Sequence, residues 1–338
     1  MAAIRLGTRG SALAVAQSTM VARSIEQLGE AVELVTITTS GDEPGGGGVT
    51  GATARPGGEA SGAPAVDDKS RFVKEIEQAL LAGEIDLAVH SAKDVPGELP
   101  DGLAIVGVPE RADPRDALCQ AALSDAPGSS AGVSSHGAAA LGSLPEGAVV
   151  GTASLRRRAQ LLALRPDLDV RELRGNVDTR LRRLAEGELD AIVLAVAGLS
   201  RLGRREEGQP LSGEALVPAA GQGCLALEAR DDDDAARRLA SRLTDPRAFA
   251  RLTAERTVVM AIDATCHTPV GVHATIENHT VLRLRTFVGT PDGASWIRDE
   301  VRGIADDPQA VGTEAAGRLI AAGATEILTG AEAAGRSS

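Results

Sequence analysis

Two short patterns each occur twice in the chain, and they constrain its fold more than any other feature. A strand-Gly-Thr-helix opening at residues 6–11 returns at 150–154. The segment Gly-Glu-Ile-Asp-Leu-Ala-Val at 83–89 returns as Gly-Glu-Leu-Asp-Ala-Ile-Val at 187–193. Short apolar runs that read as strands, alternating with segments of helical periodicity, are typical of α/β folds. The repetition therefore predicts two similar, doubly wound α/β lobes with a cleft between them.

The region after residue 230 has a different character. Apolar stretches with strand alternation follow one another at 270–276, 281–288 and 295–302, and a helical pattern occupies 310–322. Strands that are grouped together and followed by a helix are typical of α+β units. We therefore predict a small C-terminal α+β domain with a three-stranded antiparallel sheet.

The length of 338 residues exceeds what one ordinary hydrophobic core organises, so several domains are expected. A strand expected at 224–229 follows a hinge-like segment at 218–223 and returns to the first lobe. The predicted limits are 1–111 with 224–242 for domain 1, 115–217 for domain 2 and 246–338 for domain 3.

Residues 41–68 are rich in Gly, Ala and Pro and contain almost no large apolar side chains. This composition predicts a mobile insertion in the first lobe. Two interpretations stay open, a tolerated surface insertion and a functional lid over the cleft.

Charge and composition exclude several classes of protein. A net charge of −12 argues against general nucleic-acid binding, which needs a basic surface. No apolar run approaches the ~20 residues of a membrane span, and the N-terminus lacks a basic-then-apolar signal. The 3 cysteines show neither a disulfide framework nor metal-ligand spacing. We expect a cytoplasmic monomer without a metal.

The segment 87–96 is where the sequence first suggests chemistry. An apolar run at 85–89 predicts a short buried strand, and His, Ser, Lys and Asp follow it before Pro96. Ligands of open α/β sheets bind beyond the carboxyl ends of such strands. Lys93 is one of only 3 lysines beside 32 arginines, so it marks a position where arginine does not serve. Asp94 is either a turn residue or a catalytic carboxylate, and Lys93 favours its charged form.

Arginines are concentrated in the second lobe. Arg156, Arg157 and Arg158 open a helix, where basic residues are unfavourable unless an anion binds between them. Further arginines flank Gly175 and Asn176 or follow the next strand. Bidentate pairing with carboxylates is the natural use of such a set, together with Arg9 of the first lobe. The alternative is a solvated face with salt bridges to Glu172, Asp178 and Glu186.

Cys266 differs from the other two cysteines. Cys119 and Cys224 adjoin apolar stretches, which predicts buried and inert thiols. Cys266 lies beside His267 in a polar loop that precedes a strand, so it is a candidate for covalent attachment. A hydrolase that uses Cys266 and His267 is a weaker alternative, because adjacent residues seldom orient as nucleophile and base.

Taken together, these segments resemble the porphobilinogen deaminase (hydroxymethylbilane synthase) family over nearly the whole chain. Each segment alone is a modest signal, whereas their order and spacing are specific. The matching segments are 7–11, 69–75, 89–96, 113–117, 151–157, 173–180, 194–199, 218–223 and 254–256.

The resemblance implies two lobes of the periplasmic-binding-protein type and a third domain. It implies an enzyme that condenses four porphobilinogens head to tail, with release of ammonia, on a dipyrromethane cofactor. By resemblance, Asp94 and Lys93 are the catalytic residues and Cys266 holds the cofactor by a thioether. The implied cofactor-binding residues are Cys266, Lys93, Asp94, Thr152, Ser154, Arg156, Arg157, Arg174 and Gly175. The implied substrate-binding residues are Arg9, Ser11, Lys69, Phe72, Arg180 and Arg201.

The chain departs from the family pattern at two places. Ala264 and Thr265 stand where the family usually has Gly-Gly before the cofactor cysteine, and their Cβ atoms exclude backbone angles that glycine allows. A changed loop backbone is therefore expected there. The insertion at 41–68 is unusually long, and the family's flexible loop in this region favours the lid interpretation. A two-lobed carboxylate-binding protein without catalysis is the remaining alternative, although it gives Lys93, Asp94 and Cys266 no role.

Overall fold

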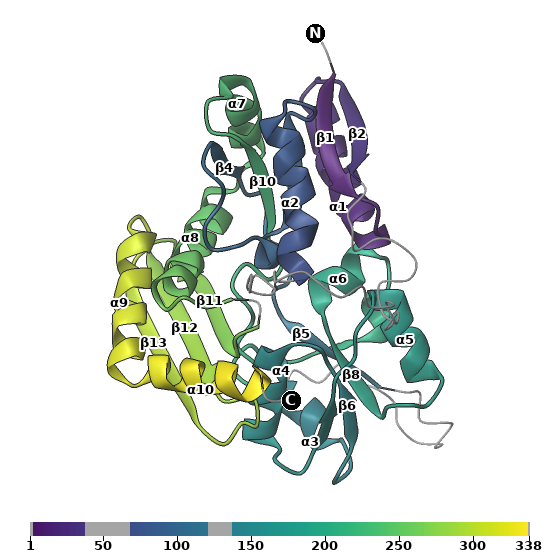
Figure 1. Cartoon of the computed structure of the whole chain (residues 1–338), viewed down its shortest axis with the longest axis vertical. Helices are drawn as coiled ribbons and strands as arrows, with labels where there is room; N and C mark the ends of the chain where they lie inside the picture. The colour runs from purple at the N-terminus through teal and green to yellow at the C-terminus, as the bar shows by residue number, and fades with distance from the viewer. Residues whose placement is uncertain (1–2, 38–67, 121–136, 266, 337–338) are drawn as a thin grey trace, which may run out of the picture.

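The computed structural model describes residues 3–37, 68–120, 137–265 and 267–336. Within them lie two five-stranded sheets and one three-stranded sheet, and each sheet forms the centre of one region of the fold (Figure 1). No helix in these ranges is long and apolar enough to cross a membrane.

The first lobe is built on a sheet with the order β2-β1-β3-β10-β4. β1 pairs in parallel with β2 and β3, whereas β10 runs antiparallel to β3 and β4. The alternation of side chains along β3 directs Leu87 and Val89 into a core with α1 and α7, and Ala88 into a core with α2. Helices therefore cover both faces of the sheet (Figure 1). The elements are β1 (Ile4–Arg9), α1 (Ala12–Gln27), β2 (Val32–Ile37), α2 (Asp68–Leu81), β3 (Leu87–Ser91), β4 (Leu103–Gly107), β10 (Leu225–Arg230) and α7 (Asp234–Leu243).

The second lobe repeats this topology with the order β7-β6-β8-β5-β9. β6 pairs in parallel with β7 and β8, and β5 runs antiparallel to β8. In both lobes the antiparallel strand lies beside the third parallel strand and enters from a connection between the lobes. The elements are β5 (Asp116–Gln120), α3 (Gly137–Gly142), β6 (Val149–Gly151), α4 (Leu155–Leu164), β7 (Asp169–Arg171), α5 (Val177–Ala185), β8 (Ala191–Ala195), α6 (Val196–Arg201), the 3-10 turn η2 (Arg205–Glu207) and β9 (Gln209–Pro210).

The C-terminal region is an antiparallel sheet with the order β11-β12-β13. Its core is made of Ala, Val and Leu side chains from the strands and from α8, α9 and α10. Phe287 is fully buried against Ala159 of α4 and Val217, so this region packs on the second lobe. The elements are α8 (Pro246–Ala261), β11 (Val270–Glu277), β12 (Val281–Gly289), β13 (Trp296–Ile304), α9 (Pro308–Ala321) and α10 (Ala324–Arg336).

The predicted fold class is therefore confirmed: two similar α/β lobes and a small α+β domain with a three-stranded antiparallel sheet. The predicted return of the chain to the first lobe is also confirmed, because β10 lies between β3 and β4. The prediction for β3 was wrong by two residues. The strand runs to Ser91 rather than ending at Val89, because β10 pairs with it as far as Leu225 opposite Ser91. His90 and Ser91 thus lie in the strand, not beyond it.

Candidate active site

Asp94 lies at the carboxyl end of β3, as the sequence indicated. The strand passes directly into a 3-10 turn, η1 (Ala92–Asp94), whose start is fixed by a hydrogen bond of 3.1 Å from Ala92 N to Cys224 O. Lys93 and Asp94 are both half-buried. The turn therefore presents a lysine and a carboxylate at the sheet edge where α/β proteins bind ligands.

Arg180 of α5 places a positive charge of the second lobe near this carboxylate. Burial and, to a smaller extent, neighbouring Arg157 lower the pKa of Arg180 to about 10, while Asp94 acts in the opposite direction. Charges influence one another in this way only at close range. Arg180 therefore lies near both Asp94 and Arg157, although Asp94 belongs to the first lobe and the two arginines to the second.

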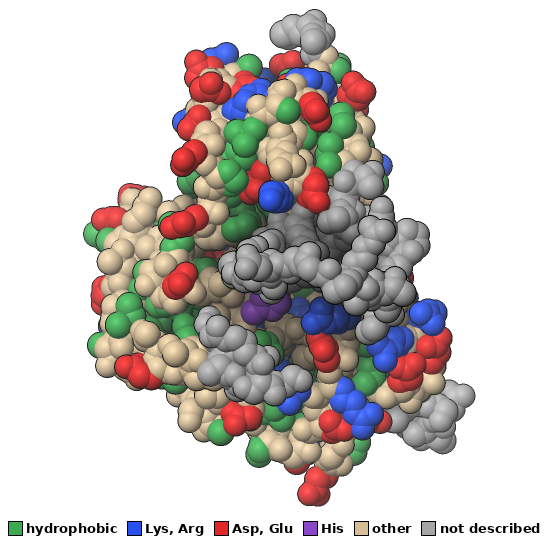
Figure 2. Space-filling model, viewed as in Figure 1, with side chains coloured by type: hydrophobic (Ala, Val, Ile, Leu, Met, Phe, Trp, Pro, Cys, Tyr) green, Lys and Arg blue, Asp and Glu red, His purple; other side chains and the backbone are tan. Residues whose placement is uncertain are grey.

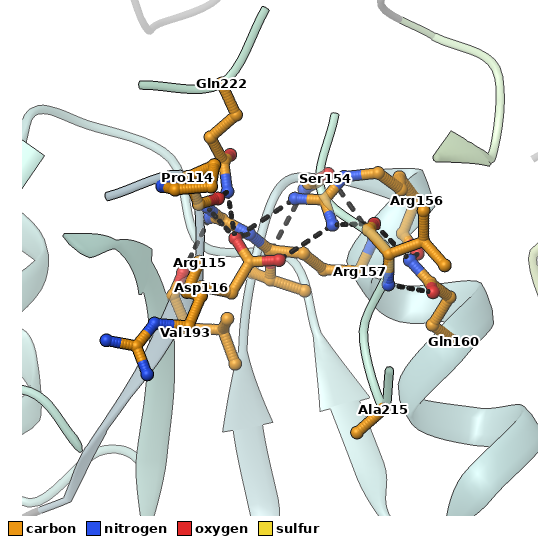
Figure 3. Close-up of polar contacts among 12 residues, drawn as sticks. Pro114, Arg115, Asp116, Ser154, Arg156, Arg157, Gln160, Val193, Ala215 and Gln222 are labelled. Carbon is orange, nitrogen blue, oxygen red and sulfur yellow. Dashed lines mark hydrogen bonds and ion pairs between the residues drawn. The ribbon is translucent and has the colours of Figure 1, made fainter. Parts of the chain in front are cut away.

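Arg156 and Arg157 are buried at the start of α4, and Asp116 of β5 binds both (Figure 3). Arg156 Nη1 lies 2.7 Å from Asp116 Oδ2, and Arg157 Nε lies 3.0 Å from Asp116 Oδ1. Burial alone would raise the pKa of Asp116, but the two guanidinium groups lower it well below its usual range. The anion that makes arginine tolerable at this helix start is thus an internal carboxylate.

Two arginines and one aspartate leave one net positive charge. Further hydrogen bonds hold the two guanidinium groups in place. Arg156 Nη1 also donates to Val217 O at 2.8 Å, and Arg157 Nη1 donates to Val193 O at 2.8 Å. Arg156 Nε is buried and has no hydrogen-bond partner among the described residues. A buried donor without a partner is costly, so an acceptor that reached this atom would stabilise the site.

Thr152 and Ser154 shape the turn before α4. Ser154 caps the helix by accepting from Arg157 N, and Ser154 N donates to the hydroxyl of Thr152 at 3.1 Å. Ser11 has the same role at α1, where its hydroxyl accepts from Ala14 N at 3.3 Å. Both helices thus begin with a serine cap just beyond the carboxyl end of a strand, and a helix start favours anions. Arg9 ends β1 two residues before Ser11.

Arg201, at the end of α6, reaches the connection between the lobes. Its Nη2 donates to Gly223 O at 2.7 Å, and burial lowers the pKa of this guanidinium. Arg201 Nε is buried without a hydrogen-bond partner in the described part of the chain. This arginine therefore also retains a donor for a ligand.

Other arginines of the second lobe form ion pairs at its surface. Arg174 pairs with Glu172 at 2.6 Å, and its side chain is 71% exposed. Arg182 pairs with Glu186 at 2.7 Å, and Asp178 binds Arg204 instead of a member of the predicted set. Both sets thus form salt bridges within the lobe: Arg174 and Arg182 on its surface with Glu172 and Glu186, and Arg156 and Arg157 in its interior with Asp116. Figure 2 shows the resulting mixture of basic and acidic side chains over the lower lobe.

Some predicted site residues cannot be placed. Cys266 lies outside the described residues, as do residues 41–67 of the insertion. Lys69 and Phe72 lie near the start of α2, and their side chains are likewise outside the description. Next to Cys266, the left-handed backbone conformation falls on Asp263, with φ of 50°, and neither Ala264 nor Thr265 adopts it. The two Cβ atoms are therefore accommodated, because the residue that needs special angles is a different one.

The sequence-based selection missed four buried polar residues that hold the site together: Asp116, Gln222, Arg111 and Glu255. Gln222 Nε2 donates to Asp116 Oδ1 at 2.9 Å, and Arg111 Nη1 lies 2.6 Å from Glu255 Oε1. Although burial opposes it, Arg111 lowers the pKa of Glu255 to about 2. The signal was present in the sequence: Arg111 and Asp116 lie in the charged connector 110–116 between the first two lobes, and Gln222 and Glu255 lie in the matching segments 218–223 and 254–256.

The described residues hold no cluster of His, Cys, Asp or Glu that could bind a metal ion. The end of β3 and the neighbouring part of the second lobe instead offer one carboxylate, one lysine and several guanidinium groups. Such groups bind acidic ligands and stabilise a positive charge that develops near the carboxylate.

Comparisons with known proteins give the family of the chain. Residues 4–238 match the family described as porphobilinogen deaminase, dipyromethane cofactor binding domain, and residues 249–321 match the porphobilinogen deaminase C-terminal domain. The chain is 44% identical over 331 residues to a porphobilinogen deaminase of Thermus thermophilus, which covers 97% of this chain and 99% of that protein. It is 43% identical over 323 residues to the one of Rubrobacter xylanophilus, covering 96% and 95%.

Among solved structures, the methionine-binding protein MetQ matches 73% of this chain and 89% of its own, with 16% identity and a TM-score of 0.39. The two-lobed organisation rests on the strand orders above rather than on this weak likeness. The two matched domains and the full-length relatives lead to one conclusion: the chain belongs to the porphobilinogen deaminase family, the hydroxymethylbilane synthases of tetrapyrrole biosynthesis.

Proposed function

We propose that the space between the two lobes is the active site of this deaminase and that Asp94 is its catalytic group. The observation that carries the proposal is the convergence of Asp94 from the first lobe with Arg157 and Arg180 from the second. Family membership decides against the binding-protein and Cys-His hydrolase alternatives.

The substrate has an aminomethyl arm and two carboxylates on one pyrrole ring. In each condensation the C–N bond to the amino group breaks and ammonia leaves. A new C–C bond then joins the methylene to the free ring carbon of the next pyrrole, which loses its proton. The methylene carries positive charge between these events. A carboxylate beside it stabilises that charge and accepts the proton, and these are the roles we assign to Asp94. Lys93 keeps this carboxylate charged.

The arginines suit the acidic side chains of the substrate and of the dipyrromethane cofactor. We assign Arg156, Arg157, Arg174 and Gly175, with Thr152, Ser154, Lys93 and Asp94, to the cofactor, and Arg9, Ser11, Lys69, Phe72, Arg180 and Arg201 to the substrate. The fit is supported by the buried unpartnered donors of Arg156 and Arg201. When bound through Cys266, the cofactor supplies the pyrrole carbon to which the first substrate is joined.

We propose the same domain limits as those expected from the sequence: 1–111 with 224–242, 115–217 and 246–338. The composition of the three sheets supports these limits. We also propose that the protein is a monomer, which light scattering after size exclusion tests. A cytoplasmic location is supported by the free, buried Cys119 and Cys224, which suit a reducing compartment.

Intact mass and turnover test the proposed site together. The purified protein is expected to carry a fixed excess of two linked pyrrole units, and Cys266→Ser removes it. Asp94→Asn is expected to lower turnover at least about 100-fold, while part of the mass excess remains. Asp101→Asn is the matched control, because Asp101 is an exposed turn residue in the same lobe. Near-normal turnover of Asp94→Asn would remove Asp94 from its central role.

A further inference from the structure

The turn that carries Asp94 is held on its C-terminal side by one residue of α8, Arg256. Arg256 Nη2 donates to the carbonyl oxygens of Pro96 and Gly97 at 2.7 Å each, and its Nη1 donates to Val95 O at 3.4 Å. Three consecutive carbonyl groups immediately after Asp94 therefore converge on a single guanidinium. Arginine suits this task, because its donors form a rigid planar fork.

The N-terminal side of the same turn is also fixed. Ala92 N binds Cys224 O at 3.1 Å, and the backbone of Gly221 packs against the turn. A Cβ atom at Gly221 would lie only 3.0 Å from Lys93 N. Lys93 and Asp94 are therefore the only residues between the anchored Ala92 and the anchored Val95.

The helix that supplies Arg256 also supports the turn by apolar packing. Ala92 and Val95 share a buried cluster with Ala248 and Leu252 of α8. Leu252 precedes Arg256 by four residues, so both lie on the face of α8 that meets the turn. A rigid helix thus carries the apolar support and the polar anchor together.

The charge of Arg256 is balanced within the first lobe. Burial lowers the pKa of Arg256, and Glu228 of β10 acts against this. Glu228 is fully buried, and its Oε2 lies 2.8 Å from His90 Nε2 in the strand that leads to the turn. The guanidinium therefore remains charged in its half-buried position and retains strong hydrogen bonds to the carbonyl groups.

The preceding residue, Glu255, holds the hinge from the same helix. Its carboxylate accepts from Gly221 N at 2.7 Å and pairs with Arg111 of the connector. Successive residues of a helix point in different directions, so Glu255 reaches the hinge and Arg256 reaches the Asp94 turn. α8 thereby fixes the turn relative to the connections that lead to the second lobe.

We propose that Arg256 is a positioning residue for the deaminase reaction, which holds Asp94 in place against the arginines of the second lobe. The inference rests on the proposed catalytic role of Asp94. Arg256 lies outside the first lobe and sets the position of this carboxylate. Misplacement of a catalytic group by about 1 Å can cost about 100-fold in rate, so the loss of this anchor falls on turnover rather than on substrate binding.

Arg256→Met tests the inference, because it keeps an unbranched apolar stem and removes all the donors of the side chain. Arg251→Met is the matched control: Arg251 lies in the same helix, is also half-buried, and donates from Nε to Arg247 O within that helix. With cofactor loading verified by intact mass, Arg256→Met is expected to lower kcat about 10- to 100-fold and to leave KM within about threefold. Arg251→Met is expected to keep kcat within about twofold. A folded Arg256→Met protein with the kcat of wild type would overturn the inference.

Arg256→Lys gives a second test that does not depend on the folding of Arg256→Met. One ammonium cannot serve three carbonyl groups as a planar fork does, so a loss of about 3- to 10-fold in kcat is expected. Wild-type kcat for Arg256→Lys contradicts the inference.

The Asp94→Glu background separates positioning from general damage to the structure. If Arg256 acts through Asp94, Arg256→Met costs less than about threefold in a protein whose carboxylate is already displaced. An equal loss in both backgrounds contradicts the inference. Near-normal turnover of Asp94→Asn defeats the proposed function itself, whereas a severe Asp94→Asn defect with a normal Arg256→Met protein defeats the inference alone.

Discussion

Asp116 and Arg157 form a buried ion pair, with 2.8 Å between Asp116 Oδ1 and Arg157 Nη2. The Asp116 carboxylate is fully buried, and the Arg157 side chain is 6% exposed. Because the same aspartate also binds Arg156, one carboxylate orients two arginines that the resemblance assigns to the cofactor. Asp116 thus holds both arginines in place without a bound acidic ligand.

Replacement of Asp116 by Asn is expected to destabilise the fold by about 3–5 kcal/mol, because it leaves buried arginines without their carboxylate. Denaturant unfolding measures this change. Asp169→Asn is the control, since the Asp169–Arg171 pair is about half exposed and contributes less than about 1 kcal/mol. Similar losses for both variants would show that Asp116 has no special role.

The stability supplied by Asp116 has a defined pH dependence. Its pKa is lower in the folded state than its ordinary value of 3.8, so its contribution is present above that pH and is lost as the pH falls further. The difference in unfolding free energy between wild type and Asp116→Asn is therefore expected to shrink below about pH 4. A difference that grows as the solution is acidified would contradict the pairing.

Gly221→Ala is expected to impair both stability and turnover. Gly221 has φ of 69°, and an added Cβ would lie 2.9 Å from Ala92 C and 3.0 Å from Lys93 N. The comparison is Gly187→Ala, where φ is 78° but no atom lies within 4 Å of the new Cβ. Gly187→Ala is expected to cost about 1 kcal/mol of backbone strain and no activity. Gly221→Ala should exceed this cost and lower kcat; equal effects would show that the contact with the Asp94 turn is unimportant.

Arg180→Gln is expected to raise KM for porphobilinogen about 10- to 100-fold, because a charge-assisted contact to a substrate carboxylate contributes about 1.5–3 kcal/mol. Arg182→Gln is the control, since Arg182 lies two residues further along α5 and pairs with Glu186 on the surface. Steady-state kinetics distinguish the two. An unchanged KM for Arg180→Gln would place the substrate carboxylates elsewhere.

The raised pKa of Glu77 in α2 predicts that the folded protein loses stability as the pH rises. Burial, with a further contribution from Glu228, raises the pKa of Glu77 to about 7, although His90 and Lys74 oppose this. Since the ordinary value is 4.5, the folded state holds this proton more tightly than the unfolded state. The contribution is thus complete below about pH 4.5 and is lost as the pH rises toward 7.

Glu77→Gln removes this titration and is expected to be more stable than wild type at pH 8, by about 1–3 kcal/mol. Urea unfolding between pH 5 and pH 8 measures the difference. Glu84→Gln is the control, because Glu84 is exposed in the turn that follows α2. Wild-type and Glu77→Gln curves that stay parallel over this range would contradict the assignment.

The boundaries of most elements could be predicted because they depend on local interactions. Ser11 and Ser154 cap α1 and α4 as single residues next to an apolar helical pattern. The repeated segments form corresponding strand orders in the two lobes, because similar patterns of buried strands and amphipathic helices pack in the same way. Helices α7 and α10 were not predicted; α7 follows an acidic run that obscured its apolar face.

Sequence alone thus determined the two lobes, the third domain, the family and the candidate status of Asp94, because these depend on patterns carried by neighbouring residues. The tertiary structure decided which charges meet. Asp116 reaches Arg156 across 40 residues, and Arg256 reaches Pro96 across 160. The partner of a buried charge is set by how the sheets and helices pack around it, since burial requires compensation wherever the fold supplies it. No local pattern contains that information.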